Sequence, residues 1–213
     1  MSAVSSLLII LLLSFSYTLI YRCFNNKWLR DYAGYSLYVW GVILLAVPLV
    51  VKDNMIYALP HKLEAILLPF VVILVLNIIA VRYSGYRPVG RFHIFNFVFI
   101  YPLLEEMLFR GIILPIFTKL LSPTEWIELL WLPITMPVLL TALLFAISHL
   151  QYYKLSRQSV IYMLFAFIGG TIFGAMTAAT GSIWPSLLLH IQFNAMCVLH
   201  SRRFGAAAEQ FKE

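Results

Sequence analysis

The chain is short of charge. Only 11% of its 213 residues are Asp, Glu, Lys or Arg, whereas 62% are hydrophobic. A soluble domain is about half apolar and about a quarter charged. A mean hydropathy of +0.90 therefore excludes an ordinary soluble domain and indicates a polytopic membrane protein.

The apolar runs lack the alternation of apolar and polar residues that marks the strands of a membrane β-barrel. They are continuous and about 20 residues long, which is the length that a helix needs to cross a bilayer. We therefore predict an all-α fold, a polytopic transmembrane helical bundle of about seven spans. The expected spans are 3–21, 34–51, 63–81, 93–118, 132–153, 158–180 and 183–200. The first run has neither a basic residue before it nor a small-residue cleavage site after it, so we expect a retained helix.

Cysteine is scarce, and repeats, linkers and low-complexity segments are missing. Cys23 and Cys197 are far apart and lack the spacing of a metal site, so we expect two free thiols. The chain then forms one bundle. Within it we expect three N-terminal transmembrane helices in residues 1–90, a core of four spans in 91–200 and a cytoplasmic tail in 201–213.

Acidic residues are fewer than basic ones, 9 against 15, which gives a net charge of +6. In a soluble protein this excess could indicate nucleic-acid binding. Here the basic residues lie in short loops, so membrane topology explains them better and we expect no nucleic-acid partner.

The basic residues also divide unevenly between the two sides of the expected bundle. Eleven lie in the first, third and fifth loops and in the tail: Arg22, Lys27, Arg30, Arg82, Arg87, Arg91, Lys154, Arg157, Arg202, Arg203 and Lys212. The other loops hold Lys52, Lys62 and Lys119. The positive-inside rule then predicts an outside N-terminus and a cytoplasmic C-terminus. The short length without a targeting extension favours the plasma membrane of a bacterium or an archaeon.

Three ionisable residues lie inside the fourth expected span: Glu105, Glu106 and Arg110. One such residue at the bilayer centre costs about 3 kcal/mol on insertion scales, and such residues normally mark a functional site. Glu106 and Arg110 are four apart, so they can pair on one helical face. Glu105 is rotated by about 100° from Glu106 and remains free to act. Pro102 removes one backbone hydrogen bond just before the pair and predicts a bend.

Two later spans supply polar partners at helical spacing. Phe145 and His149 share a face near the end of the fifth span, and His190 and Asn194 share one in the seventh. Each pair alone could be packing or an interfacial residue. Together with Glu105 they predict a site, because a carboxylate in a partly dry cavity can act as general base on a water. Histidine and an asparagine amide can position that water or stabilise an oxyanion.

Two other chemistries fit the sequence less well. No serine or cysteine has an obvious base at motif spacing, so covalent catalysis is less attractive. Glu105, His149 and His190 could instead hold zinc. Asparagine is a poor zinc ligand, so Asn194 favours a site that requires no metal.

The ordered motifs resemble those of the CAAX-processing and bacteriocin-maturation proteases, also called the CPBP or Abi family. They are Glu105-Glu106-x-x-x-Arg110, Phe145-x-x-x-His149 and His190-x-x-x-Asn194, and the resemblance covers about residues 90–200. This family includes the enzymes that cleave the last three residues from prenylated CaaX proteins. The resemblance implies an intramembrane endopeptidase whose cavity opens toward the cytoplasm.

The resemblance also implies a role for each motif residue. Glu105 would activate water, and His149, His190 and Asn194 would complete the site. Glu106, Arg110 and Phe145 would support these residues. The family has been described both as a metalloprotease and as a glutamate-dependent protease, so zinc remains the alternative.

The substrate class follows only in outline. We expect a membrane-embedded or membrane-associated protein or peptide, lipidated or not, and the oligomeric state is open. One alternative function is a non-catalytic membrane scaffold or immunity protein, which loss of a motif residue would have favoured. Another is a proton-coupled transporter, which inverted repeats would have favoured. Neither sign is present in the sequence.

Overall fold

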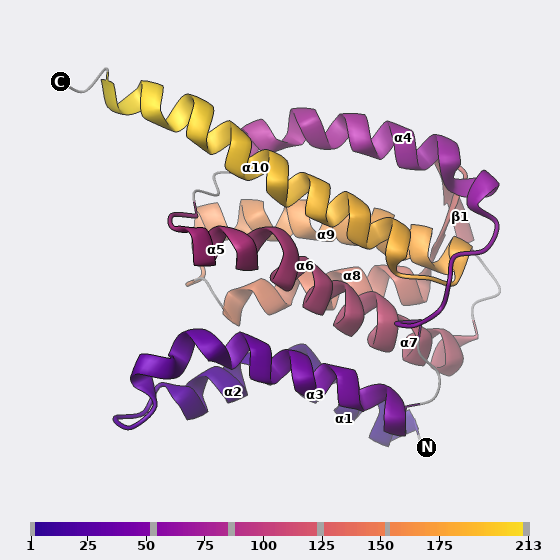
Figure 1. Cartoon of the computed structure of the whole chain (residues 1–213). Coiled ribbons are helices and arrows are strands. Elements are labelled where there is room, and N and C mark those ends of the chain that lie inside the picture. The colour runs from indigo at the N-terminus through magenta and orange to yellow at the C-terminus, as the bar shows by residue number, and fades with distance from the viewer. Residues whose placement is uncertain (1–2, 52–54, 85–87, 123–125, 152–153, 211–213) are drawn as a thin grey trace.

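A computed structural model describes residues 3–51, 55–84, 88–122, 126–151 and 154–210. These residues are helical almost throughout, which confirms the all-α fold class (Figure 1). Arg87, Lys52 and Lys212, which were counted in the charge asymmetry, lie outside the described ranges. Cys23 is exposed, Cys197 is buried, and both are free thiols.

The N-terminal helices form a layer of their own. The layer comprises α1 (Ala3–Ser14), α2 (Ser16–Phe24), the 3-10 helix η1 (Arg30–Tyr35) and α3 (Ser36–Val50). It lies below the rest of the bundle in Figure 1. The expected span 3–21 is not one straight helix, because α1 and α2 meet at 47°.

The bend between α1 and α2 has a specific cause. In a straight helix the N–H of Thr18 would donate to the carbonyl of Ser14. Here the side-chain amide of Gln151 is inserted between them. Its Oε1 accepts from Thr18 N at 3.1 Å and from Thr18 Oγ1 at 2.7 Å, and its Nε2 donates to Ser14 O at 2.9 Å. A side chain inserted into the backbone ladder is a recognised cause of a helix kink.

The fourth expected span is a continuous helix whose hydrogen bonding changes along its length. It runs through α5 (Arg91–Phe95), the π-helix η3 (Asn96–Ile100), α6 (Tyr101–Glu105), the π-helix η4 (Glu106–Ile113) and α7 (Leu114–Leu121). Pro102, which lacks an N–H, is the second residue after the first π segment. The π-helix is rare and is often found at functional sites. Here the second π segment contains Glu106 and Arg110.

The helix expected from residue 132 begins later. Residues 126–135 form an antiparallel hairpin of β1 (Trp126–Leu129) and β2 (Leu132–Thr135), and α8 runs only from Met136 to Ser148. Leu130 and Trp131 form the turn with φ of 51° and 61°. The 3-10 helix η5 (His149–Gln151) follows α8, and positions 152–153 of the expected span lie outside the described residues.

The remaining helices flank the central one. They are α4 (Leu63–Ala80) with the 3-10 helix η2 (Val81–Tyr83), α9 (Arg157–Thr180) and α10 (Trp184–Gln210). In Figure 1, α4 and α10 lie on the side opposite to α1–α3, with α10 crossing in front of α9. Because α10 continues to Gln210, the expected tail from residue 201 begins inside a helix.

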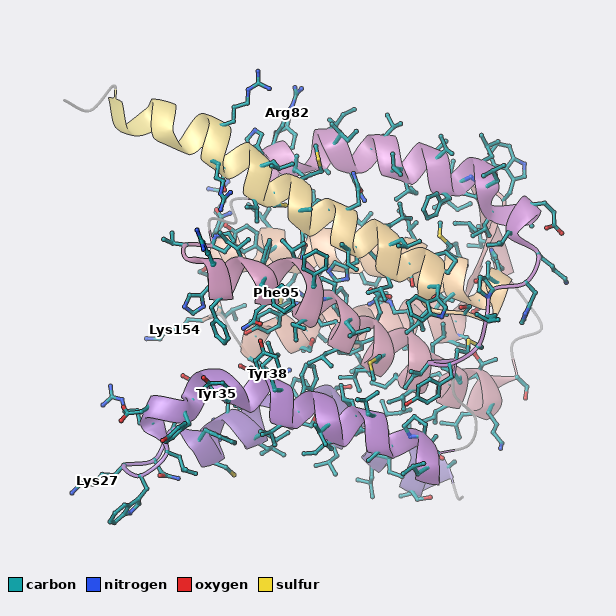
Figure 2. All side chains as sticks on the ribbon, viewed as in Figure 1. Lys27, Tyr35, Tyr38, Arg82, Phe95 and Lys154 are labelled. Carbon is teal, nitrogen blue, oxygen red and sulfur yellow. The ribbon has the colours of Figure 1, made fainter. Side chains whose placement is uncertain are left out.

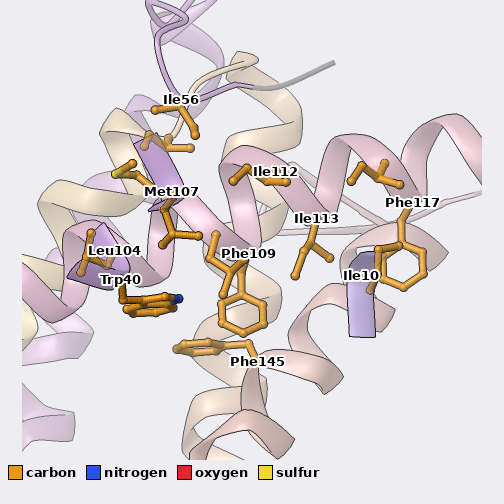
Figure 3. Packing of buried hydrophobic residues seen from close by; sticks show 14 of the residues in the cluster. Ile10, Trp40, Ile56, Leu104, Met107, Phe109, Ile112, Ile113, Phe117 and Phe145 are labelled. Atoms are coloured by element: carbon orange, nitrogen blue, oxygen red, sulfur yellow. The ribbon is translucent and has the colours of Figure 1, made fainter. Parts of the chain in front are cut away.

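A hydrophobic cluster joins the N-terminal layer to the central helix. Ile10, Leu37, Trp40 and Leu44 come from the layer, and they pack in one cluster with residues 104–117 of the central helix and with Phe145. Figure 3 shows the indole of Trp40 beside Leu104, and the rings of Phe109 and Phe145, which meet edge to face with 5.1 Å between their centres. The layer is therefore part of the same fold as the core.

The number of membrane crossings remains a prediction. By length and composition, three described helices could span a membrane, or four if the bent pair α1 and α2 forms one span. The helices α8 and α10 do not qualify: α8 is short, and α10 carries His190, Gln192 and Asn194. The two chain ends lie at opposite ends of the bundle in Figure 1, and Lys27 and Lys154 lie at the end where α10 finishes (Figure 2).

Candidate active site

A cavity of about 460 Å³ lies between α4, the central helix, α8, α9 and α10. Glu105, His149, His190 and Asn194 all line it, as does Phe145. The structure thus brings the four candidate catalytic residues to one place from three separate helices. Most other lining residues are apolar: Ile73, Leu76, Ala80, Phe97, Phe165, Ala166, Ile168, Ile172, Phe173 and Phe193.

Glu106 and Arg110 lie behind the cavity and form the expected pair. Arg110 NH1 donates to Glu106 Oε1 at 3.1 Å, and both side chains are fully buried. Arg110 NH2 also donates to the carbonyl of Gly170 at 3.4 Å, which connects the central helix to α9. The pair can be buried because each charge has an opposite charge and hydrogen-bond partners.

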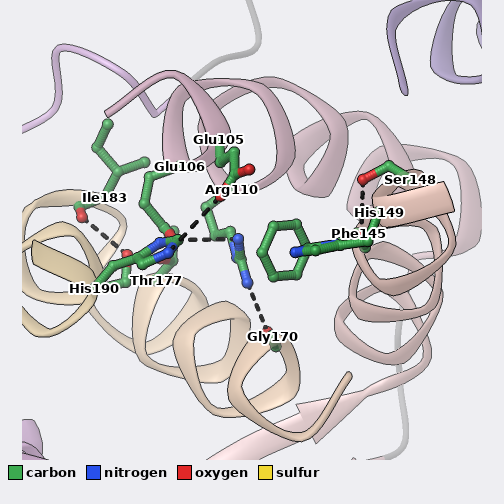
Figure 4. A network of polar contacts seen from close by, with 11 residues as sticks. Glu105, Glu106, Arg110, Phe145, Ser148, His149, Gly170, Thr177, Ile183 and His190 are labelled. Carbon is green, nitrogen blue, oxygen red and sulfur yellow. Dashed lines mark hydrogen bonds and ion pairs between the residues drawn. The ribbon is translucent and has the colours of Figure 1, made fainter. Parts of the chain in front are cut away.

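The imidazole of His190 lies between the two glutamates. Its Nδ1 is 2.9 Å from Glu106 Oε1, and its Nε2 is 3.7 Å from Glu105 Oε2. A carboxylate accepts hydrogen bonds, so Nδ1 carries a hydrogen and Nε2 is directed toward Glu105. The expectation that the two glutamates point apart is therefore only partly right: Glu105 faces the cavity and Glu106 does not, yet one ring contacts both. The buried Glu106 fixes the orientation of His190 (Figure 4).

Phe145 separates the buried arginine from His149. The Arg110 guanidinium lies 4.4 Å from the centre of the Phe145 ring, a cation–π contact. The His149 ring meets the same ring edge to face with 4.9 Å between centres (Figure 4). Nδ1 of His149 is 2.9 Å from the Phe145 carbonyl, which only accepts, so this nitrogen donates. Phe145 thereby holds His149 by both its ring and its backbone.

Asn194 is anchored in a similar way. Its Nδ2 donates to the carbonyl of Phe97 at 2.7 Å, and only 6% of the residue is exposed. Nδ2 has a second hydrogen, and the residue lines the cavity. A donor that is already fixed can stabilise a developing oxyanion without reorganising.

Close packing of α8 on α9 supports the site. A Cβ added to Gly170 would lie 3.1 Å from the Phe145 ring, 3.2 Å from Arg110 NH2 and 3.3 Å from Ala142 Cβ. A Cβ added to Gly174 would lie 3.2 Å from Val138. These two glycines let α9 approach α8, as small residues do in membrane helix pairs. Ala178, the small residue four positions after Gly174, is exposed.

Sequence reasoning missed the part that α4 plays. Asn77 lines the cavity, and its Nδ2 donates to Leu189 O at 3.2 Å and to Gln192 Oε1 at 2.8 Å. Gln192 in turn donates to Leu74 O at 3.3 Å. The signal was present, because Asn77 is a single amide in an otherwise apolar run, and such residues join membrane helices.

Glu105, His149 and His190 were the expected ligands if zinc is bound. No group of three or more His, Cys, Asp or Glu side chains suited to a metal occurs among the described residues. Nδ1 of His149 and Nδ1 of His190 are each engaged by a protein oxygen, as is usual for histidines whose other ring nitrogen binds a metal. Glu105 and His190 approach each other, while His149 lies on the far side of the Phe145 ring from Arg110 (Figure 4). In the mechanism proposed below, Glu105 acts without a metal.

Comparison with known proteins agrees with this geometry. The family model for type II CAAX prenyl endopeptidases, Rce1-like, matches residues 87–196, which is more than half of the chain. The searches of curated proteins and of solved structures found no match. The matched segment contains all three motifs, whereas Asn77 of α4 lies outside it. The chain belongs to the Rce1-like family of type II CAAX prenyl endopeptidases, which are CAAX-type intramembrane proteases.

Proposed function

We propose that this protease hydrolyses a peptide bond of a membrane-associated or lipidated protein with a water activated by Glu105. The observation that carries the proposal is the 3.7 Å separation of Glu105 Oε2 and His190 Nε2 at the cavity wall. This separation is too long for a good direct hydrogen bond, and polar contacts of this length can be bridged by a water. A water held there donates one O–H to each acceptor and presents a lone pair to the substrate.

The reaction then proceeds in two steps. Glu105 takes a proton from the water, whose oxygen bonds to the scissile carbonyl carbon and gives a tetrahedral oxyanion. The second Nδ2 hydrogen of Asn194 stabilises that oxyanion. The protonated Glu105 next gives its proton to the amide nitrogen as the C–N bond breaks. A carboxylic acid and an amine are released, and the acid then gives its proton to the amine.

The other motif residues position these groups. Glu106 keeps Nδ1 of His190 protonated, so that Nε2 faces the water. Arg110 balances the charge of Glu106 and connects it to α9. Phe145 holds His149. The apolar cavity wall suits a substrate segment without charge.

The test is cleavage by the purified protein in lipid nanodiscs. Lipidated and unlipidated forms of one peptide series are incubated with it, and new termini are identified by mass spectrometry. We expect cleavage that survives a strong chelator and is lost in Glu105→Gln. Cleavage abolished by the chelator and restored by zinc would replace this mechanism with a metal-dependent one. Equal cleavage by Glu105→Gln would remove Glu105 from the mechanism.

We propose further that the cavity serves the cytoplasmic side of a plasma membrane, with seven spans and an outside N-terminus. The 11-to-3 distribution of basic residues supports this orientation. Reporter fusions at the two ends should report opposite sides. Finding both ends on one side would contradict the span number and the orientation together.

A further inference from the structure

A second concave site lies at the end of the bundle where α4 and α10 finish. It is a groove of about 1010 Å³, separate from the active-site cavity in its lining residues. Its lining residues come from α4 with η2 and from α10: Ile78, Val81, Arg82, Met196, Leu199, His200, Arg202 and Arg203. The active-site mechanism uses none of them.

The groove combines two kinds of surface. Arg82, Arg202 and Arg203 are exposed and come from two different helices, and His200 adds a fourth basic group. None of the described residues that line the groove is acidic. Figure 2 shows Arg82 at the end of α4 beside α10. The rim therefore attracts an anion.

The wall of the groove is apolar and continues along the outer faces of the helices. Ile78 is 43% exposed and Leu199 is 58% exposed. In a membrane protein such residues meet lipid chains rather than water. A ligand that fits both surfaces has a negative head and an apolar body joined to it.

We propose that this groove binds an anionic phospholipid, with the headgroup phosphate among Arg82, Arg202 and Arg203 and an acyl chain along Ile78 and Leu199. Basic pockets between transmembrane helices on the cytoplasmic side bind such headgroups in other membrane proteins. The site bridges α4 and α10, whose contact also forms one wall of the active-site cavity. A bound lipid thus holds these two helices together at the end of the bundle.

The test measures lipid binding to the purified full chain in neutral detergent, by titration with phosphatidylglycerol and with phosphatidylcholine. One variant replaces the three groove arginines: Arg82→Gln, Arg202→Gln and Arg203→Gln. A matched control removes three positive charges elsewhere at the same end: Lys27→Gln, Arg30→Gln and Arg157→Gln. All six positions are exposed, so both variants should fold.

An arginine close to an anionic lipid surface contributes a factor of about five in affinity. The groove variant should therefore bind phosphatidylglycerol on the order of 100-fold more weakly than the wild type. The control should stay within about threefold, because its charges lie outside the groove. Phosphatidylcholine should bind weakly to all three proteins.

Three results would overturn the proposal. Equal losses in the groove variant and the control would mean that overall charge attracts the lipid. If the wild type bound phosphatidylcholine as tightly as phosphatidylglycerol, the negative charge of the lipid would not determine binding. Displacement of the lipid by glycerol phosphate at equal concentration would mean that the groove recognises a free phosphate. If the triple variant does not fold, Arg82→Gln alone should lose about fivefold, and no loss there would count against the site.

Discussion

Different interactions stabilise the packing within the N-terminal layer and within the core. Among the described residues, the buried polar side chains of α1–α3 are serines: Ser6, Ser14 and Ser36. The core buries Glu106, Arg110, His190 and Asn194 as well as several hydroxyl groups. The layer packs through apolar side chains and local serine bonds such as Ser14 Oγ to Ile10 O. The core packs around a charge network.

This difference predicts how well each region tolerates substitution. Apolar contacts between membrane helices tolerate exchange, because lipid chains are as apolar as the side chains they replace. A buried charge network does not tolerate exchange, because a group without its partner in a low dielectric is costly. Substitutions in the core should therefore have larger and more specific effects than substitutions in the layer.

The largest effect is expected at Glu105. Glu105→Gln keeps the shape but removes the base, and general acid–base groups contribute about 10²–10⁴-fold to a rate. We expect kcat to fall by about 10³-fold while thermal stability in detergent stays unchanged, because this carboxylate faces the cavity. A stability loss as large as the activity loss would assign Glu105 to the structural network instead.

Glu106→Gln should act through stability. It leaves the fully buried Arg110 without its charged partner, and breaking such a pair costs about 3–5 kcal/mol. It also weakens the bond that orients His190. Chemical unfolding of the folded fraction measures the loss of stability, and kcat of that fraction measures the effect of the weaker bond to His190. A fully stable Glu106→Gln protein would mean that Arg110 has found another anion.

Substitutions at two glycines test whether the core is packed more tightly than the N-terminal layer. A Cβ on Gly111 in the core would come within 2.5 Å of Ile56 Cγ1, so Gly111→Ala should cost about 1–3 kcal/mol. Gly34 in the N-terminal layer is the control, because a Cβ there would meet only Phe92 at 3.7 Å. Gly34→Ala should leave the melting temperature unchanged. Equal melting temperatures for both variants would contradict tighter packing in the core.

The smallest effect is expected at Gln151, whose side chain hydrogen-bonds to the N-terminal layer. Gln151→Ala removes three hydrogen bonds, but Thr18 N and Ser14 O can then bond to each other in a straight helix. The net loss should be about 1 kcal/mol, with a reduced bend between α1 and α2. A disulfide or spin-label distance across the bend measures the straightening. Thr18→Val removes only the hydroxyl bond and should keep the bend; a straightened helix there would assign the bend to Thr18.

The sequence was enough to predict the membrane class, the helical fold and the residues that meet in the cavity. Helical spacing placed Arg110 beside Glu106, because residues four apart remain neighbours even where the helix is π-helical. The same spacing could not reveal that His190 contacts both glutamates, since that contact depends on how α10 crosses the central helix. The catalytic roles remain predictions.

Other features had no signal in the sequence. The hairpin turn at Leu130 and Trp131 has positive φ at both positions, where asparagine and glycine are the usual residues. The strand after the turn was therefore assigned to the start of a helix, whereas residues 126–129 were expected in a loop. The π segments have the same apolar composition as an α-helix, so composition does not distinguish them. The bend at Phe15 depends on Gln151, which is more than 130 residues away.

The long sequence separation between Thr18 and Gln151 affects the order in which the protein assembles. Residues 14 and 18 leave the ribosome long before Gln151 does, and in lipid their backbone groups must be satisfied at every stage. If residues 3–21 cross the membrane as one span, we therefore expect them to enter the bilayer as a straight helix, with Thr18 N bonded to Ser14 O. Only when η5 arrives can the amide of Gln151 replace that bond at both ends and bend the helix. On this expectation, the angle between α1 and α2 forms late in assembly, when the finished core bends the segment that was inserted first.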